Sequence, residues 1–268
     1  MTSPSVRLVL SDVDGTLVNA KKELSPRAVA MVERLREADI LFALTSSRPP
    51  RGVSMFVEPL HLTTPIAAFN SAMIVEPDLR VIEKRTIDDD LSVQVLSLLD
   101  EFQISMWVYQ GDGWYVRDLN GPHTQREASV VDFQPKLLEN LDALFSGVAK
   151  IVGVSDDVKA MTDVQVAIRE KFGDRVSATE SQPYYLDITH PLANKGSAVD
   201  YFARRFAIPT DAIATIGDAY NDVPMFERSG LSIAMGNAVS DVKAAAREVT
   251  TSNEDDGFAN AIEQFILP

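Results

Sequence analysis

Short apolar runs that each end at a polar cluster constrain the fold of this chain more than any other feature. The runs at residues 6–10, 40–44, 66–69 and 212–216 are mostly aliphatic, and acidic, amide or hydroxyl side chains follow each of them within two residues. Such runs are typical of strands buried on both faces of a parallel sheet. Because open α/β sheets bind ligands outside the carboxyl ends of their strands, we expect these polar side chains to lie together.

Helical patterns accompany these runs near both ends of the chain. Ser25 and Pro26 combine an N-cap residue with a proline suited to the first helical position, and apolar residues follow at helical spacing. A further helix is expected from Lys195. Strand, helix and strand in this order are typical of a parallel α/β sheet.

The pattern changes in the middle of the chain, which predicts a second domain inserted into the first. Helices are expected over residues 91–99, 135–145 and 158–172, and strands over 106–109, 114–116, 150–154, 176–179 and 184–188. Residues 110–113 are a hairpin signal between two of these strands. We therefore expect a discontinuous core at 1–84 and 189–268, interrupted by an α/β domain at 85–188.

Charge and composition argue against several classes of protein. The chain has 39 acidic and 25 basic side chains, a net charge of −14, whereas nucleic-acid binding needs a basic face. No early apolar stretch approaches the roughly 20 residues of a membrane span, and the N-terminus lacks a signal-peptide layout. The absence of cysteine excludes thiolate metal sites and a cysteine nucleophile. We expect small-molecule chemistry in the cytoplasm, with neither nucleic acid nor membrane as a partner.

Two aspartates that follow the first apolar run are candidates for catalysis. Asp12 and Asp14 lie two residues apart at the predicted strand end, and Gly15 allows a sharp turn after them. Paired carboxylates allow a division of labour, in which one is a nucleophile and the other gives a proton to a leaving group. Taken alone, such a pair is more often a solvated turn or a helix cap.

A second acidic cluster, residues 217–222, follows the run at 212–216. Asp218 and the first aspartate pair would together make a site of oxygen ligands, which suits Mg²⁺. Asn221 and Asp222 are explained equally well as the cap of the helix that follows.

Two other polar side chains are placed where an anion could bind. Lys195 begins a predicted helix, whose N-terminus favours anions, and Ser46 follows the second apolar run. Each has an ordinary alternative, because most lysines are solvated and serine is a common cap.

All these elements occur together, in the same order, in one known family. The sequence resembles the haloacid dehalogenase (HAD) superfamily of phosphotransferases, and within it the Cof-type sugar-phosphatase-like branch, over nearly the whole chain. The resemblance rests on four motifs and two shorter signatures, at residues 12–17, 45–49, 194–196, 217–222, 69–72 and 234–238. It implies a Rossmann-like parallel-sheet core with an inserted α/β cap of the C2 type.

The resemblance also implies a Mg²⁺-dependent phosphoric monoester hydrolase that works through an aspartyl phosphate. Asp12 would attack phosphorus, and Asp14 would protonate the leaving oxygen and then activate water. Asp12, the carbonyl of Asp14 and Asp218 would hold Mg²⁺. Lys195 and Ser46 would bind phosphoryl oxygens. Asn221 and Asp222 would not bind the metal directly. They would orient Lys195 or a metal-bound water molecule.

The sequence departs from the branch at two points. The second motif usually reads Thr-Gly-Arg, so the alignment makes Ser46 the phosphate-binding hydroxyl and leaves Thr45 as an alternative. Asn70 and Ser71 replace the usual Asn-Gly. Asn70 is therefore a candidate phosphate or substrate contact on a changed turn.

The cap is expected to close over the core and to contact the leaving group, with hinges near 83–86 and 187–190. Candidate substrate contacts are the aromatic residues Trp107, Tyr109, Trp114 and Tyr115. Such alternate strand residues also commonly pack a sheet core. Arg48 would either reach a substrate hydroxyl or carboxylate, or lie on the surface.

The leading hypothesis is a phosphatase of a small phosphorylated metabolite resembling a sugar phosphate, acting as a monomer or a homodimer. One alternative is a phosphomutase resembling the phosphomannomutases, which share the start of the first motif but usually have a longer fourth motif. The other is a non-catalytic module that binds a phospho-ligand, as receiver domains do. Receivers are about half this length and have no cap, so this alternative explains less of the chain.

Overall fold

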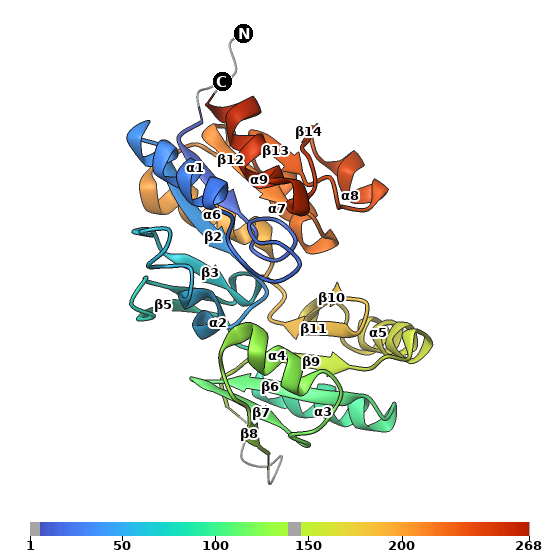
Figure 1. The fold of residues 1–268 in the computed structure, drawn as a ribbon. Helices are drawn as coiled ribbons and strands as arrows, with labels where there is room; N and C mark the ends of the chain where they lie inside the picture. The colour runs from blue at the N-terminus through green and yellow to red at the C-terminus, as the bar shows by residue number, and fades with distance from the viewer. Residues whose placement is uncertain (1–5, 139–145, 268) are drawn as a thin grey trace.

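Two β-sheets form the framework of the computed structural model, which describes residues 6–138 and 146–267 (Figure 1). The larger sheet has the strand order β14-β13-β12-β1-β2-β3-β4-β5. The smaller sheet has the order β10-β11-β9-β6-β7-β8. The protein therefore has the predicted mixed α/β architecture, with a parallel-sheet core and an α/β cap.

The larger sheet is parallel from β14 to β3 and antiparallel from β3 to β5. Its strands are β1 (Leu8–Ser11), β2 (Leu41–Thr45), β3 (Ile66–Ala68), β4 (Met73–Val75), β5 (Val81–Lys84), β12 (Ile213–Gly217), β13 (Leu231–Ala234) and β14 (Glu248–Val249). Its α-helices are α1 (Pro26–Glu37), α2 (Pro50–Ser54), α6 (Lys195–Phe206), α7 (Val223–Phe226), α8 (Ser240–Ala245) and α9 (Gly257–Ala261). Short turns of other helix types are η1 (Phe69–Ser71), η4 (Thr210–Ala212), η5 (Tyr220–Asp222), η6 (Asn253–Asp255) and η7 (Ile262–Ile266).

Helices cover both faces of the larger sheet, because the strand residues are apolar on both sides. Val9 and Phe42 pack with α1 and α9 on one face. Leu8 and Leu10 pack with α6, α7 and α8 on the other. This explains why the parallel strands read as nearly continuous apolar runs. The polar residues that follow the strands are left at their carboxyl ends.

The smaller sheet has two different faces. Its strands are β6 (Ser105–Gln110), β7 (Gly113–Val116), β8 (Lys136–Leu137), β9 (Val148–Val154), β10 (Ser177–Gln182) and β11 (Tyr185–Thr189), and its helices are α3 (Asp89–Glu101), α4 (Thr124–Val131), α5 (Val158–Phe172) and the short η3 (Gly173–Arg175). Aliphatic residues on one face pack against α3 and α5. Aromatic residues on the other face pack against α4 and against Phe69 and Met73 of the core. In Figure 1, α4 lies between this sheet and the core.

Most of the predicted elements are confirmed, with ends shifted by one to three residues. Helix α1 begins where expected, and Ser25 caps it by accepting a hydrogen bond from the amide of Ala28 at 3.1 Å. Helix α5 has the predicted bounds. The expected hairpin at residues 110–113 joins β6 to β7.

The helix predicted at residues 135–145 is wrong where it can be compared. Lys136 and Leu137 form β8, which pairs with Tyr115 and Val116 of β7, and residues 139–145 lie outside the described part of the chain. The helix of this region is α4, which the sequence analysis missed. His123, the residue before α4, has a left-handed backbone and makes no capping bond, so the usual start signal is absent.

The strands of the larger sheet come from residues 8–84 and 213–249, and those of the smaller sheet from residues 105–189. We propose domain boundaries at 84/85, as predicted from the sequence, and at 189/190, one residue beyond the predicted 188/189, because Thr189 still pairs with Ser177 and Lys150 of the smaller sheet. Within the described residues, no helix combines the length and apolar character needed to cross a membrane.

Candidate active site

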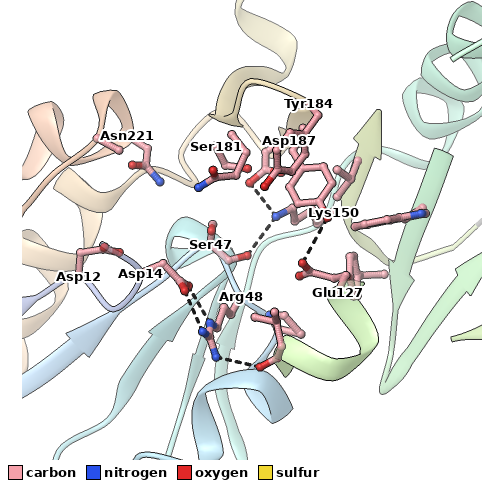
Figure 2. A pocket seen from close by; sticks show the side chains of 18 of the residues that line it. Asp12, Asp14, Ser47, Arg48, Glu127, Lys150, Ser181, Tyr184, Asp187 and Asn221 are labelled. Atoms are coloured by element: carbon pink, nitrogen blue, oxygen red, sulfur yellow. Dashed lines mark hydrogen bonds and ion pairs between the residues drawn. The ribbon is translucent and has the colours of Figure 1, made fainter. Parts of the chain in front are cut away.

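One cavity lies where the carboxyl ends of β1, β2 and β12 face the cap, and both parts of the chain line it (Figure 2). The core contributes charged side chains, among them Asp12, Asp14, Arg48, Lys195 and Asp218. The structure therefore brings together the polar residues that the sequence places at separate strand ends.

Asp12 and Lys195 form the buried centre of this site. Lys195 is the first residue of α6 and is 1% exposed, and its Nζ donates to Asp12 Oδ1 and to Asp222 Oδ1, each at 2.5 Å. Burial alone would lower the pKa of Lys195, but the two carboxylates outweigh it and raise that pKa. Burial raises the pKa of Asp12 to about 7, against the lowering effect of Lys195. The solvated-lysine alternative is wrong for Lys195.

Asp222 organises the loop that follows β12. Its Oδ2 accepts hydrogen bonds from the amides of Asp218 and Ala219 at 2.8 and 2.9 Å, while its Oδ1 accepts from Lys195. Its side chain makes no capping bond to α7, but it caps the preceding turn η5 by accepting from the amide of Ala219, so Asp222 has a capping role as well as its contact with Lys195. Asp222 thus links Lys195 to the fourth motif.

The turn after Asp12 brings the first motif against the fourth. Gly15 has a φ of +80°, and a Cβ atom there would lie 2.2 Å from Asp218 Oδ2, so a side chain is excluded. Thr16 Oγ1 donates to Asp218 Oδ1 at 3.3 Å. Asn237, from the C-terminal signature, donates to Gly15 O and to Asp218 Oδ2 at 2.9 and 3.1 Å.

Three carboxylates of this site fit a hard divalent cation. Asp12, Asp218 and Asp222 each offer an oxygen, and these oxygens lie within 4.8 Å of one another. Burial and the neighbouring carboxylates raise the pKa of Asp218. The three carboxylates can carry more negative charge than Lys195 neutralises. A bound cation would neutralise the remainder. Asp12 and Asp218 line the cavity, whereas Asp222 is not among the described residues that line it and is held by Lys195 and two amides, so Asp12 and Asp218 are the better ligands.

The carboxylate of Asp14 lies apart from this group and faces Arg48 (Figure 2). Arg48 Nε and Nη2 donate to its two oxygens at 2.7 and 2.8 Å, and Lys22 Nζ lies 2.7 Å from Oδ1. Although burial opposes them, these cations hold the pKa of Asp14 well below its usual range. Asp14 is therefore ionised in this arrangement.

Arg48 is buried and connects the core to the cap. Only 3% of it is exposed, so the surface alternative is wrong. Besides Asp14, its Nη1 donates to the carbonyls of Gly52 and of Val130, the latter in α4, at 3.0 and 3.2 Å. Its guanidinium is engaged by protein groups around the cavity.

Ser46 and Asn70 lie next to the cavity, but neither is among the described residues that line it. Ser46 Oγ accepts from the amide of Arg48 at 3.1 Å, and the amide of Asn70 donates to Ser46 O at 2.8 Å. Asn70 Oδ1 accepts from Asn221 at 3.2 Å, so Asn70 connects the loops of the second and fourth motifs. Thr45 Oγ1 is buried and has no hydrogen-bond partner within the described residues.

The aromatic candidates in the cap divide into two groups. Trp107 and Tyr109 line the cavity. Trp114 is fully buried behind them, with its ring 5.2 Å from Trp107 and stacked 5.8 Å from Tyr109. Tyr115 packs against the opposite, aliphatic face. The structure thus brings neither residue to the cavity: Trp114 shares the face of Trp107 and Tyr109 but is buried among their rings, and Tyr115 points to the other face because side chains alternate along a strand.

Sequence reasoning missed most of the polar cap residues that line the cavity. They are Arg126, Glu127, Lys150, Ser181, Gln182, Tyr184, Tyr185 and Asp187. The available signal was a charged residue inside an apolar strand, as Lys150 is in β9 and Asp187 is in β11. Lys22 of the core, which contacts Asp14, was also missed.

Comparison with known proteins identifies the family. A model of the haloacid dehalogenase-like hydrolases matches residues 9–262. The chain belongs to this family. The predicted superfamily, its Cof-type branch and the phosphatase class of enzyme are therefore confirmed.

Three similar proteins match this chain over nearly their whole lengths. The "Putative phosphatase" of Haemophilus influenzae is 29% identical over 259 residues, which are 96% of this chain and 97% of that protein. The 5-amino-6-(5-phospho-D-ribitylamino)uracil phosphatase YitU of Bacillus subtilis is 26% identical over 271 residues, covering 96% and 97%. A haloacid dehalogenase-like hydrolase from Bacteroides thetaiotaomicron has a TM-score of 0.86 at 25% identity, covering 97% and 99%.

Replacing Asp222 with alanine is expected to destabilise the fold by about 3 kcal/mol. The change removes one of the two carboxylates that hold the buried ammonium of Lys195 and leaves two amides without their acceptor. Urea denaturation measures the difference. The matched control is Asp241→Ala, because Asp241 is exposed, and its expected effect is within about 0.5 kcal/mol. Equal effects of the two variants would contradict this account of Asp222.

Proposed function

We propose that this protein is a Mg²⁺-dependent phosphatase that hydrolyses a small phosphorylated metabolite through an aspartyl phosphate on Asp12. One observation carries the proposal: the carboxylate of Asp12 is buried beside the Lys195 ammonium and the Asp218 carboxylate, at the inner end of a cavity covered by a cap. Membership of a hydrolase family with phosphatases among its relatives supports the same chemistry.

Asp12 acts as the nucleophile. One of its carboxylate oxygens forms a bond to phosphorus while the bond between phosphorus and the leaving oxygen breaks. Lys195, in contact with Asp12, reduces the repulsion between this carboxylate and an anionic phosphate ester. Water then attacks phosphorus, releases phosphate and restores the Asp12 carboxylate.

Asp14 serves as the acid and then the base. It gives a proton to the leaving oxygen in the first step and takes one from water in the second. In the arrangement described here it is ionised and held by Arg48 and Lys22. The first step therefore requires Asp14 to take up a proton and to turn from these cations towards the leaving group.

The metal is assigned to Asp12, Asp218 and the carbonyl of Asp14. A cation held there would supply positive charge that offsets the repulsion between the Asp12 carboxylate and an anionic phosphate ester. Asp222 holds the loop of Asp218 in place through its two amide contacts. Asn221 lines the cavity and is held by Asn70.

The remaining phosphoryl oxygens are assigned to Lys195 and to the Ser46 hydroxyl. Ser46 Oγ already accepts the amide of Arg48, which leaves its hydrogen for the substrate. Asn70 supports the phosphate loops through Ser46 and Asn221.

The proposed substrate is a small phosphate ester in the cytoplasm, resembling a sugar phosphate. Relatives named 5-amino-6-(5-phospho-D-ribitylamino)uracil phosphatase, and a structural neighbour at 20% identity called a sugar phosphatase, motivate the choice of esters to test. Trp107 and Tyr109 form part of the wall that such a substrate would meet.

Phosphate release from a panel of phosphorylated sugars, polyols and aryl alcohols tests the proposal. We expect release with Mg²⁺, none with excess chelator, and a loss of about a thousandfold or more in Asp12→Asn. Melting temperatures of both proteins show whether the variant is folded. Turnover that survives the substitution would exclude the mechanism. Conversion of a sugar 1-phosphate to its 6-phosphate without phosphate release would support the phosphomutase alternative.

A second prediction concerns Asp14. The variant Asp14→Asn should lose about 10²- to 10⁴-fold in kcat/KM on alkyl phosphates, whose leaving oxygen needs a proton. The loss on 4-nitrophenyl phosphate should be smaller, because nitrophenolate leaves without one. The aryl ester is thus the control within the same variant. An equal loss on both esters contradicts the role of Asp14 as the acid.

A further inference from the structure

Three charged cap residues face the cavity and take part in none of the steps above. Lys150 of β9, Asp187 of β11 and Glu127 of α4 lie across the cavity from the phosphate loops (Figure 2). We refer to them as the cap triad. Their position is the one that the leaving group of a phosphate ester would occupy once its phosphate meets Asp12 and Lys195.

Lys150 and Asp187 form an ion pair that burial makes costly. They are 5% and 2% exposed, and Lys150 Nζ lies 2.6 Å from Asp187 Oδ2. Two apolar side chains would often stabilise such a sheet as well or better. The same ammonium donates to the carbonyl of Ser47 at 3.0 Å, which ties it to the second motif. These contacts use two of its three hydrogens.

Asp187 has an acceptor that the protein does not satisfy. Its Oδ1 is buried, and within the described residues it has no hydrogen-bond partner. Leaving a buried charged acceptor without a donor is unfavourable. Because Asp187 also lines the cavity, a hydrogen-bond donor on a bound ligand can bind to this Oδ1 atom. Burial raises the pKa of Asp187, while the neighbouring Lys150 ammonium and Ser181 hydroxyl lower it.

Glu127 provides a second acceptor. It receives a hydrogen bond from the Tyr185 hydroxyl at 3.4 Å and is half-buried. Burial raises the pKa of Glu127, and Lys150 partly lowers it. The cavity thus presents an ammonium between two carboxyl groups.

The charges of the cap lining decide what kind of leaving group fits. Among the described residues of this lining, Arg126 and Lys150 are cationic and Glu127 and Asp187 are anionic, so the two signs balance. Because the signs balance, a carboxylate, a second phosphate or an amine would meet as many like charges as opposite charges and gain little net attraction. A hydroxyl group both donates and accepts, so it can serve Asp187 and Lys150 together.

We propose that the cap triad selects an uncharged leaving group with neighbouring hydroxyl groups, by donating from Lys150 and accepting at Asp187 and Glu127. This inference rests on the phosphatase function proposed above. It makes the cap triad the part of the site that determines specificity, whereas Asp12, Asp14 and Lys195 act on the phosphate. The aromatic rings of Trp107 and Tyr184 offer apolar walls to the carbon skeleton.

The test compares esters with the same phosphate and different leaving groups. Ribose 5-phosphate and glycerol 1-phosphate have uncharged, hydroxylated leaving groups. The leaving group of 3-phosphoglycerate carries a carboxylate and that of phosphoethanolamine an amine, whereas that of phenyl phosphate carries no further hydroxyl group. We expect wild type to have its highest kcat/KM on a neutral hydroxylated ester. A preference for the carboxylate or the amine would overturn the proposal.

The variant Asp187→Asn keeps the shape of the side chain and removes its charge. We expect kcat/KM on the best hydroxylated ester to fall about 10- to 100-fold, mostly through KM, and turnover of phenyl phosphate to change less than about threefold. The matched control is Asp163→Asn, an exposed aspartate of α5 in the same domain, which should leave both activities unchanged.

The outcomes separate this proposal from the one on which it rests. No Mg²⁺-dependent release from any ester by wild type would refute the phosphatase function. Release by wild type, followed by equal losses on the hydroxylated ester and on phenyl phosphate in Asp187→Asn, would refute the role of the cap triad and leave the phosphatase function intact. Retained phenyl phosphate turnover also shows that the variant is folded.

Discussion

The buried ammonium of Lys195 is the interaction on which the active site depends. It lies between the carboxylates of Asp12 and Asp222, which come from the loops after two different strands. A cation in this position keeps two acidic groups close together inside the protein, where their repulsion would otherwise separate them or protonate one of them. Asp222 in turn binds the amides of Asp218 and Ala219, so one lysine positions both the proposed nucleophile and the loop proposed to bind the metal.

The aromatic face of the cap sheet is directed towards this centre. The charged cap residues Glu127, Lys150 and Asp187 line the cavity together with aromatic side chains of that face. Arg48 and Lys150 each bond across the junction, to the Val130 carbonyl of the cap and to the Ser47 carbonyl of the core. The loop of the second motif, which is proposed to bind phosphate, is therefore in contact with the cap that is proposed to hold the leaving group. If the cap closes over a bound ester, these contacts would form together with the proposed phosphate site, and closure would exclude water.

Much of the fold and of the catalytic centre could be predicted because the signals are local. Asp12, Lys195 and Asp218 each follow or begin an element that is plain in the sequence, and parallel topology brings such ends together. Side-chain direction carries no such signal, so the burial of Arg48 against Asp14 was not foreseen. Lys150 and Asp187 are 37 positions apart on neighbouring strands, and Glu127 lies on a helix without a cap. Their grouping depends on tertiary packing that no short motif records.

The most direct test of this account is to trap the covalent intermediate. The protein is mixed with Mg²⁺ and its best phosphate ester, quenched in acid during turnover, digested and analysed by mass spectrometry. The account predicts one added phosphoryl group on the peptide containing Asp12, absent from Asp12→Asn and from a sample without Mg²⁺. A phosphoryl group on another residue, or turnover with no labelled peptide under conditions that preserve acyl phosphates, would contradict the role of Asp12 as the nucleophile.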